Sequence, residues 1–131
     1  MEFTALWIFE DELKYLHEIN FVSARFSFSP PVHKYQGILY FEESLIKLEG
    51  TNNDGLTIIE INIYKSQIDE IFLGFDQIYT IYVSRGLGFW KPIRIKYINN
   101  KLISTLYLIV NYRIGFTDNN KFFNLLKDWL I

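Results

Sequence analysis

The last fifteen residues, TDNNKFFNLLKDWLI, most constrain the fold, because they are the clearest helix signal in a chain that otherwise has strand-like sequence. On a helical wheel the polar side chains fall on one face and the apolar ones on the other. Thr117 is the predicted N-cap, and Asp118 suits the positive end of the helix dipole. The segment therefore predicts an amphipathic helix that closes a sheet or barrel. Its apolar face comprises Phe122, Phe123, Leu125, Leu126, Trp129 and Leu130.

The preceding sequence predicts a series of short antiparallel strands, because apolar and polar residues alternate with the period of a half-buried strand. In the most regular of them, LTIIEINIY, isoleucines alternate with Glu60 and Asn62. The last strand is apolar on both faces at residues 106–109, which is typical of a strand covered on both sides. The predicted strands are 3–8, 21–28, 37–41, 44–49, 56–64, 66–75, 77–84, 93–97 and 101–110.

Turn signals separate these strands. Pro30 and Pro31 end the second one, because proline cannot donate to a strand ladder. GTNNDG at 50–55 is the strongest turn signal, and Asn99-Asn100 predicts a hairpin turn. A bulge or bend is expected near Gly74, and a loop at 89–92. Three acids at 10–12 precede apolar residues spaced by three, which predicts a short helix over roughly 10–18, with a hairpin as the alternative.

Composition narrows the classes of protein to which the chain can belong. With 131 residues it fits a single domain over 1–131, and its 50% hydrophobic content excludes a disordered chain. The absence of cysteine excludes disulfides, thiolate catalysis and cysteine-ligated metals. A net charge of −2 argues against a nucleic-acid partner. The N-terminus does not read as a secretory signal and no long apolar run spans a membrane, so we expect a cytoplasmic protein.

These observations give a mainly β, α+β fold class: an antiparallel barrel or sandwich of about seven strands closed by a C-terminal helix. That order resembles the pleckstrin-homology superfold, including GRAM and bacterial PH-like domains, over roughly residues 21–131. GILYFEESLIKLEG at 37–50 is similar to the first strand pair of GRAM-type domains, and Trp129 resembles the tryptophan that is typical of the closing helix of pleckstrin-homology domains. The resemblance implies that Trp129 packs onto the barrel as a plug.

The resemblance also implies a scaffold that binds phosphoinositides, peptides or protein partners and is not usually catalytic. Lipid-binding members carry basic residues after the first strand and into the second. This chain departs from that pattern, because it offers only Lys47 there, near Glu42, Glu43 and Glu49. Phosphoinositide binding of the usual kind is therefore not expected.

The clearest basic run is RGLGFWKPIRIKYINNK at 85–101, which contains no acid. Aromatic residues at a loop tip beside cations suit a membrane interface or a stacked ligand. The alternative is structural: Trp90 plugs the end of the barrel, and Arg94 and Lys96 form the solvated face of an alternating strand. The candidate binding residues are Arg85, Phe89, Trp90, Lys91, Arg94 and Lys96.

No motif of catalysis, metal binding or cofactor binding stands out. His17 and His33 lack a metal-ligand partner at helical spacing, and His33 is expected to be exposed in its loop. The acidic pairs at 42–43 and 69–70, and the run at 10–12, are expected to be turn and surface charges, since adjacent residues on a strand point to opposite faces. An enzyme is accordingly the least favoured reading, with no cofactor.

Two functional hypotheses remain. The first is a non-catalytic binding or assembly module that recognises a protein partner or a second copy of the chain, with a lipid headgroup as a less favoured ligand. The abundance of aromatic residues on both faces of the strands suggests that a partner covers some apolar surface. The alternative is a small β-barrel that carries an apolar ligand in its interior.

Overall fold

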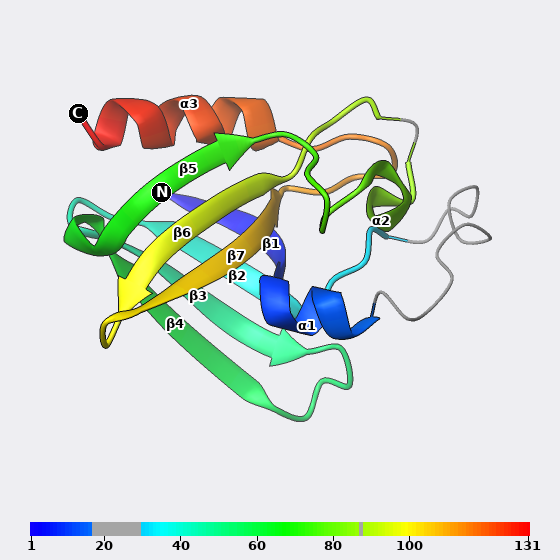
Figure 1. Cartoon of the computed structure of the whole chain (residues 1–131), viewed down its shortest axis with the longest axis horizontal. Coiled ribbons are helices and arrows are strands. Elements are labelled where there is room, and N and C mark those ends of the chain that lie inside the picture. The colour runs from blue at the N-terminus through cyan, green and yellow to red at the C-terminus, as the bar shows by residue number, and fades with distance from the viewer. Residues whose placement is uncertain (17–29, 87) are drawn as a thin grey trace.

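The computed structural model describes residues 1–16, 30–86 and 88–131 of the chain. It shows one antiparallel sheet curled into a half-barrel, with a helix at the C-terminus (Figure 1). The fold class expected from the sequence is thereby confirmed. The predicted strand over 21–28 and His17 lie outside the described residues.

Within the described residues seven strands form the sheet, and the other elements are short except for the last helix. The strands are β1 (Glu2–Phe9), β2 (Tyr35–Phe41), β3 (Leu45–Asn52), β4 (Ile58–Tyr64), β5 (Ile68–Leu73), β6 (Ile93–Asn99) and β7 (Leu102–Val110). The helices are α1 (Glu10–Leu16), α2 (Ile81–Ser84) and α3 (Asn119–Trp129), with a 3-10 turn η2 (Lys65–Gln67) between β4 and β5.

The strand order, β4-β3-β2-β1-β7-β6-β5, places the first and last strands of the chain at the centre and leaves β4 and β5 at the two edges. The backbones of β2 and β3 approach closely at Gly37 and Gly50, which face each other in the register. A Cβ at Gly37 would lie 1.9 Å from the carbonyl oxygen of Glu49, so a side chain does not fit there. Glycine thus permits the close approach of the two strands.

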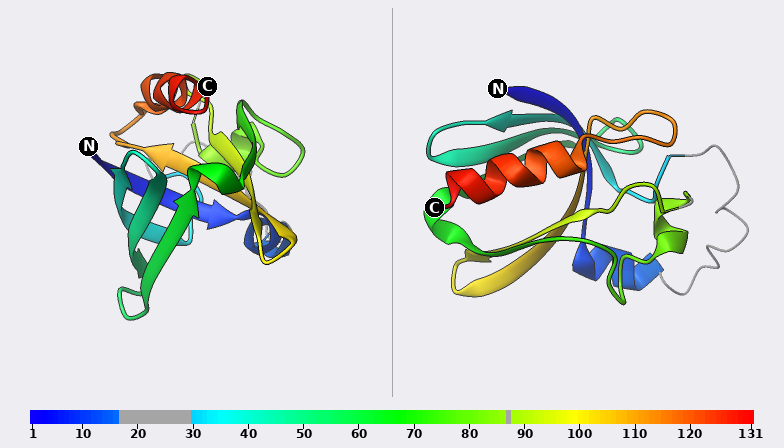
Figure 2. Two further views of the ribbon diagram at one scale, coloured as in Figure 1. Left: turned by 90° about the vertical axis from the view of Figure 1, so that its left-hand side faces the viewer. Right: turned by 90° about the horizontal axis from the view of Figure 1, so that it is seen from above.

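The main core fills the concave side of the sheet beneath α3. Figure 2 shows α3 lying between the half of the sheet formed by β2 and β3 and the half formed by β5 and β6. Phe122 is fully buried and meets the rings of Phe3 and Phe41 edge to face at centroid distances of 5.2 and 5.3 Å. Leu126, one turn later, is also fully buried. The apolar face predicted for the C-terminal segment therefore closes this core.

A second cluster of buried residues lies on the opposite, convex side of β1 and β7. Ile8, Tyr107 and Ile109 contribute the sheet side of this cluster, and Leu13 of α1 and Val83 of α2 cover it. Residues 106–110 of β7 are consequently buried on both faces, as the sequence predicted. The two clusters explain why the chain carries more apolar residues than a half-barrel with one wet face needs.

Most local predictions are confirmed. The segment 3–8 lies in β1, and α1 follows it directly, so the helix prediction holds and the hairpin alternative is wrong. In β4 the side chains of Ile59, Ile61 and Ile63 lie inward, while Glu60 and Asn62 are exposed. The β6–β7 loop is Asn100-Lys101, one residue beyond the expected turn, with the positive φ at both residues that a type I′ turn requires.

The strand predicted over 77–84 is wrong, because this segment forms a tight turn and the short helix α2. The Oδ1 atom of Asp76 accepts hydrogen bonds from the N–H groups of Ile78 and Tyr79 at 2.8 and 2.7 Å, which turns the chain away from the sheet. Tyr79 and Val83, four residues apart, are both fully buried in the convex cluster. Burial at helical spacing thus overrides the apparent alternation of QIYTIYVS.

Further details differ from the sequence-based expectations. Trp129 is only half-buried and packs at the margin of the core against Phe41, so Phe122 and not Trp129 is the plug. The N-cap of α3 is Asp118, although the Thr117 hydroxyl still accepts a hydrogen bond from the N–H of Asn119. The irregularity in β5 lies between Ile68 and Glu70, not near Gly74.

Candidate functional site

Arg94, from the predicted basic run, is occupied by structural contacts. Its guanidinium donates to Asp76 at 2.9 Å and to Glu70 at 2.6 Å, and it lies over the ring of Phe72, 4.6 Å from the centroid. Burial alone would lower the pKa of Arg94, but its two carboxylate partners outweigh that effect and raise it. A cation so neutralised holds the loop before α2 against the sheet and has little charge left for a ligand.

The other cations of the run lie apart from one another. Arg85, in the left-handed conformation after α2, donates to the carbonyl oxygen of Pro30 at 3.2 Å. The Lys91 ammonium donates to the carbonyl oxygen of Gly88 at 3.2 Å and lies over the ring of Phe75. Lys96 pairs with Glu70 across β5 and β6 in the register. The six candidate residues therefore do not converge on one basic pocket.

The two aromatic residues of the run differ in burial. Trp90 is buried in the convex cluster, in edge contact with Tyr112 at 6.4 Å, so it does not plug the barrel. Phe89 is 77% exposed, and it lines a shallow depression together with Phe116, which is 66% exposed. Two loops distant in sequence thus present apolar tips side by side.

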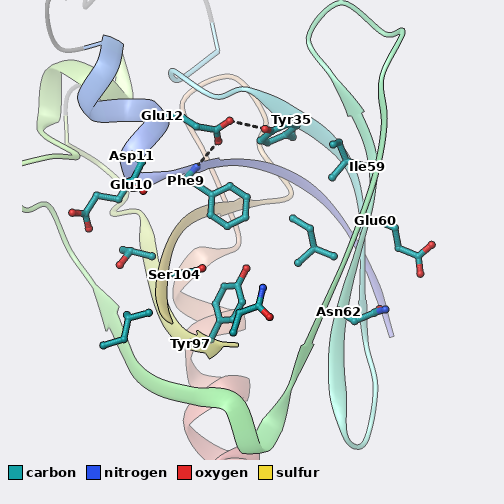
Figure 3. A pocket seen from close by; sticks show the side chains of 14 residues that line it. Phe9, Glu10, Asp11, Glu12, Tyr35, Ile59, Glu60, Asn62, Tyr97 and Ser104 are labelled. Atoms are coloured by element: carbon teal, nitrogen blue, oxygen red, sulfur yellow. Dashed lines mark hydrogen bonds between the residues drawn. The ribbon is translucent and has the colours of Figure 1, made fainter. Parts of the chain in front are cut away.

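A larger cleft, missed by the sequence analysis, opens between β4 and the β6–β7 hairpin, where the half-barrel does not close (Figure 3). It encloses about 740 Å³. Its apolar lining comes from Phe9, Tyr35, Ile59, Ile61, Tyr97 and Ile103. Its polar lining comes from Glu10, Asp11, Glu12, Glu60, Asn62, Asn99, Ser104 and Thr105.

The first turn of α1 is fixed at the rim of this cleft by Glu12. One carboxylate oxygen accepts the N–H of Phe9 at 3.0 Å, and the other accepts the Tyr35 hydroxyl at 2.5 Å and the Lys34 ammonium at 2.8 Å. Burial and this carboxylate raise the pKa of Tyr35, which keeps its hydroxyl protonated as a donor. The network ties α1 to β2, and Figure 3 shows the contacts of Glu12 with Tyr35 and Phe9.

The cleft has an excess of negative charge. Glu10 pairs with Lys14 at 2.8 Å, and Glu60 lies 3.6 Å from Lys47, which is closer to Glu49. Asp11 has no ion-pair partner among the residues described and is exposed. Figure 3 shows that Glu60 points away from the cleft to the outer side of β4. Acidic side chains therefore stand at the α1 rim of an apolar floor and on the outer face of β4.

Sequence reasoning missed the cleft because its acids were expected to be isolated surface charges. The sequence does show three consecutive acids directly after an apolar strand. It does not show that β4 and the β6–β7 hairpin form the other walls of the cleft. His33 also differs from expectation, since it is half-buried and its Nδ1 atom lies 2.7 Å from the carbonyl oxygen of Pro31. Burial lowers the pKa of His33 despite that contact.

The chain matches no protein-family model, and its sequence matches none of the curated proteins with which it was compared. Within residues 1–16, 30–86 and 88–131, no group of three or more His, Asp or Glu side chains is placed to hold a metal ion. No helix in that same part of the chain is long and apolar enough to cross a membrane. The cleft and the apolar loop tips are the surface features that suit a ligand or a partner.

Proposed function

We propose that the protein is a non-catalytic binding module that recognises a basic segment of a partner protein in the cleft beside β4. The observation that carries this proposal is the combination of an apolar floor with carboxylates at the α1 rim and on the outer face of β4. Apolar burial supplies affinity, and the acids select a cationic partner. No described residue with a cationic side chain lines the cleft itself; Lys14 and Lys34 pair with Glu10 and Glu12 at its rim, and Asp11 has no ion-pair partner among the described residues.

Exposed apolar side chains near the cleft support a macromolecular partner over a small molecule. Ile58 of β4 is 84% exposed, and Ile103 of β7, which lines the cleft, is 63% exposed. Leu102 at the same hairpin is exposed as well. A protein segment that enters the cleft covers more of this surface than a buried small ligand does.

Fluorescence anisotropy with a labelled, capped octapeptide of alternating lysine and valine tests the proposal. We expect it to bind at least about tenfold more tightly than the glutamate–valine peptide of the same length, with weaker binding at higher salt. Asp11→Lys reverses an exposed charge at the rim. It removes one attraction to the peptide and adds one repulsion, so binding should weaken about three- to tenfold.

Asp128→Lys is the matched control, because Asp128 is exposed on α3, away from the residues that line the cleft. It changes the net charge by the same amount as Asp11→Lys and should leave binding within about twofold. Equal binding of the two peptides, or equal effects of the two variants, would mean that the cleft does not select a basic segment. Circular dichroism on both variants checks that they are folded.

We also propose that the fold belongs to the pleckstrin-homology superfold, in its GRAM or bacterial branch. The curled seven-stranded antiparallel sheet and the C-terminal helix support this assignment. The resemblance covers roughly residues 21–131, whereas strand β1 of the sheet lies before that segment. A binding module in the cytoplasm remains our expectation for such a scaffold.

A second candidate function is contact with an anionic lipid surface through the apolar loop tips. Phe89 and Phe116 are exposed and line the same depression, where Lys121 supplies a cation, and Lys91 follows Phe89 by two residues in the chain. Co-sedimentation with phosphatidylserine vesicles tests this candidate, with phosphatidylcholine vesicles as the control. We expect Phe89→Ser to reduce the bound fraction, while equal sedimentation of both proteins with both vesicles would exclude a lipid role for these loops.

The alternative of an apolar-ligand carrier stays a prediction. Its natural seat is the apolar floor of the cleft, because fully buried side chains such as Phe122 and Trp7 occupy the space beneath α3. Native mass spectrometry of the purified protein tests it, since a retained lipid-sized mass would favour the carrier.

A further inference from the structure

The free edge of β4 gives the proposed partner segment a defined seat. We propose that this segment binds in extended conformation as an additional strand along β4, with cationic residues beside Glu60 and apolar residues pointing into the cleft. The inference rests on the proposed function and adds its geometry. The partner segment forms backbone hydrogen bonds with the edge of β4, and its cationic and apolar residues alternate. Strand addition is an established mode of peptide recognition at sheet edges.

Two backbone hydrogen bonds show which groups of β4 are available. Asn52 donates to the carbonyl oxygen of Thr57 at 3.1 Å, and Lys65 donates to that of Ser44 at 2.8 Å. Residues in an antiparallel pair direct their N–H and C=O groups to alternate sides. In the register of β3 and β4, the odd-numbered residues 59, 61 and 63 therefore face β3. The groups directed to the free edge belong to Ile58, Glu60 and Asn62.

The free edge of β4 ends before Tyr64. Tyr64 continues the same alternation, and its outward N–H donates to the Oε1 atom of Gln67 at 2.8 Å. The turn η2 follows immediately and carries the chain to β5. The available edge thus spans residues 58–62, which is about 17 Å of extended chain and sufficient for a segment of about five residues.

The other edge strand, β5, is flanked by a helix. Ile71 and Leu73 of β5 line a shallow depression together with Phe123 and Asn124 of α3. Figure 1 shows α3 running beside β5, whereas β4 forms the lower border of the half-barrel. Among the described strands, β4 pairs with β3 alone. An exposed edge of this kind pairs readily with another extended chain.

The side chains of β4 define the sequence of the incoming strand. Ile59 and Ile61 line the cleft with Phe9 and Tyr97, so residues opposite them are favoured when apolar. A residue directly opposite Glu60 lies on the outer face, where opposite charges attract. A second copy of β4, paired symmetrically to use all three outward residues, would place Glu60 opposite Glu60 of the partner. Like-charge repulsion disfavours that pairing, so a heterologous basic strand fits better.

N-methylated versions of the lysine–valine octapeptide test the geometry on the unaltered protein. N-methylation removes a backbone donor, and a strand directs alternate donors to its neighbour. For an antiparallel segment with its lysines opposite Glu60, methylating the three central lysine amides should weaken binding roughly 10- to 100-fold, since about three hydrogen bonds are lost. Methylating the three central valine amides should change binding less than about threefold.

Asn62→Pro provides the reciprocal test from the protein side. Proline at position 62 removes an N–H directed to the free edge and leaves the ladder with β3 intact. We expect binding to weaken about tenfold, while Asn62→Ala binds within about twofold of the parent chain. If Asn62→Pro does not fold, the methylated peptide pair decides the question.

The outcomes separate this inference from the proposed function. If the unmethylated lysine–valine peptide binds and Asp11→Lys weakens it, but the two methylated peptides bind equally, the cleft is a charge-selective site and strand addition is wrong. If the unmethylated peptide does not bind better than the glutamate–valine peptide, the proposed function itself is overturned. A strong difference between the two methylated peptides supports strand addition.

Discussion

Replacing Asp76 tests why the chain leaves the sheet after β5. One oxygen of its carboxylate accepts the N–H groups of Ile78 and Tyr79, and the other accepts the Arg94 guanidinium at 2.9 Å and the Tyr107 hydroxyl at 2.8 Å. The side chains of Asp76 and Arg94 are 17% and 18% exposed, so water replaces these contacts poorly. The loop conformation therefore depends on a single carboxylate.

Two substitutions separate its contributions to stability. Asp76→Ala removes every acceptor and leaves Arg94 facing only the more exposed Glu70, so we expect a loss of about 3–5 kcal/mol in the free energy of unfolding, as for a broken buried ion pair. Asp76→Asn keeps an oxygen for the N–H groups of Ile78 and Tyr79 but loses the charge. We expect it to lose about 1.5–3 kcal/mol, the range of hydrogen bonds to charged groups.

The pH dependence gives the sign of the effect. Burial alone would raise the pKa of Asp76, but hydrogen bonds from the Tyr79 N–H, the Tyr107 hydroxyl and Arg94 outweigh it and hold the pKa below its ordinary value. A lowered folded-state pKa stabilises the protein fully above the unfolded value of about 3.9, and this contribution is lost as the pH falls through the folded-state pKa. The stability difference between the parent chain and Asp76→Asn should therefore shrink below about pH 4.

Denaturant unfolding followed by tryptophan fluorescence at a series of pH values measures these differences. Asp69→Asn, an exposed carboxylate on β5, is the matched control and should change stability by less than about 0.5 kcal/mol. A loss below about 1 kcal/mol for Asp76→Ala, or a difference for Asp76→Asn that does not depend on pH, would refute the role assigned to this carboxylate.

Further predictions concern the core, the sheet and the loop tips. In the same unfolding assay Phe122→Ala should lose about 3–5 kcal/mol, because the ring is fully buried. Trp129→Ala should lose less, about 1.5–3 kcal/mol, because the indole is only half-buried. A larger loss for Trp129→Ala than for Phe122→Ala would mean that Trp129 is the plug. Gly50→Ala should lose at least about 1–3 kcal/mol, because its Cβ would lie 1.9 Å from the carbonyl oxygen of Gln36; unchanged stability would contradict the close approach of β2 and β3. Phe89→Ser should change stability by less than about 0.5 kcal/mol, since its ring is 77% exposed, and a larger loss would place it in the core.

The elements that the sequence predicts correctly are those decided by neighbours along the chain. In β4 the alternation of isoleucine with Glu60 and Asn62 is strong, and one face of the strand is in fact exposed. The C-terminal helix likewise follows from its own periodicity, and only the identity of its most buried residue changes. For Trp129 the reason is position: it lies on the last helical residue, whereas Phe122 lies over the centre of the core.

The prediction for 77–84 fails because the deciding interactions are distant in sequence. QIYTIYVS alternates like a strand, but Asp76 is held by Arg94, 18 residues later, and by Tyr107, 31 residues later. Both partners come from strands of the sheet, so their proximity to Asp76 exists only once the sheet has formed. No local pattern carries that information.

The candidate site could be predicted only in part, because contacts between residues distant in sequence also shape it. The sequence identifies Phe89 as an exposed tip, but it cannot show that Arg94 is already paired with two acids. It also cannot show that the acids of α1 face a cleft, because the opposite wall is β4, some fifty residues away in the chain. A sequence shows the charged residues but not their ion-pair partners. In this fold those partners determine which charged side chains can still contact a ligand.

The charges around β4 have a competing explanation, and it makes a different prediction. Charged residues on an edge strand protect it from aggregation, and Glu60 with Lys47 suits that role. Protection requires charge of either sign on the edge itself, and it gives no reason for Asp11 to stand exposed on α1 at the rim of the cleft. If protection were the whole explanation, Glu60→Lys would preserve solubility and Asp11→Lys would have no effect on binding. Addition of a basic strand instead places the incoming lysines beside Glu60, so Glu60→Lys should remain soluble and lose affinity for the lysine–valine peptide.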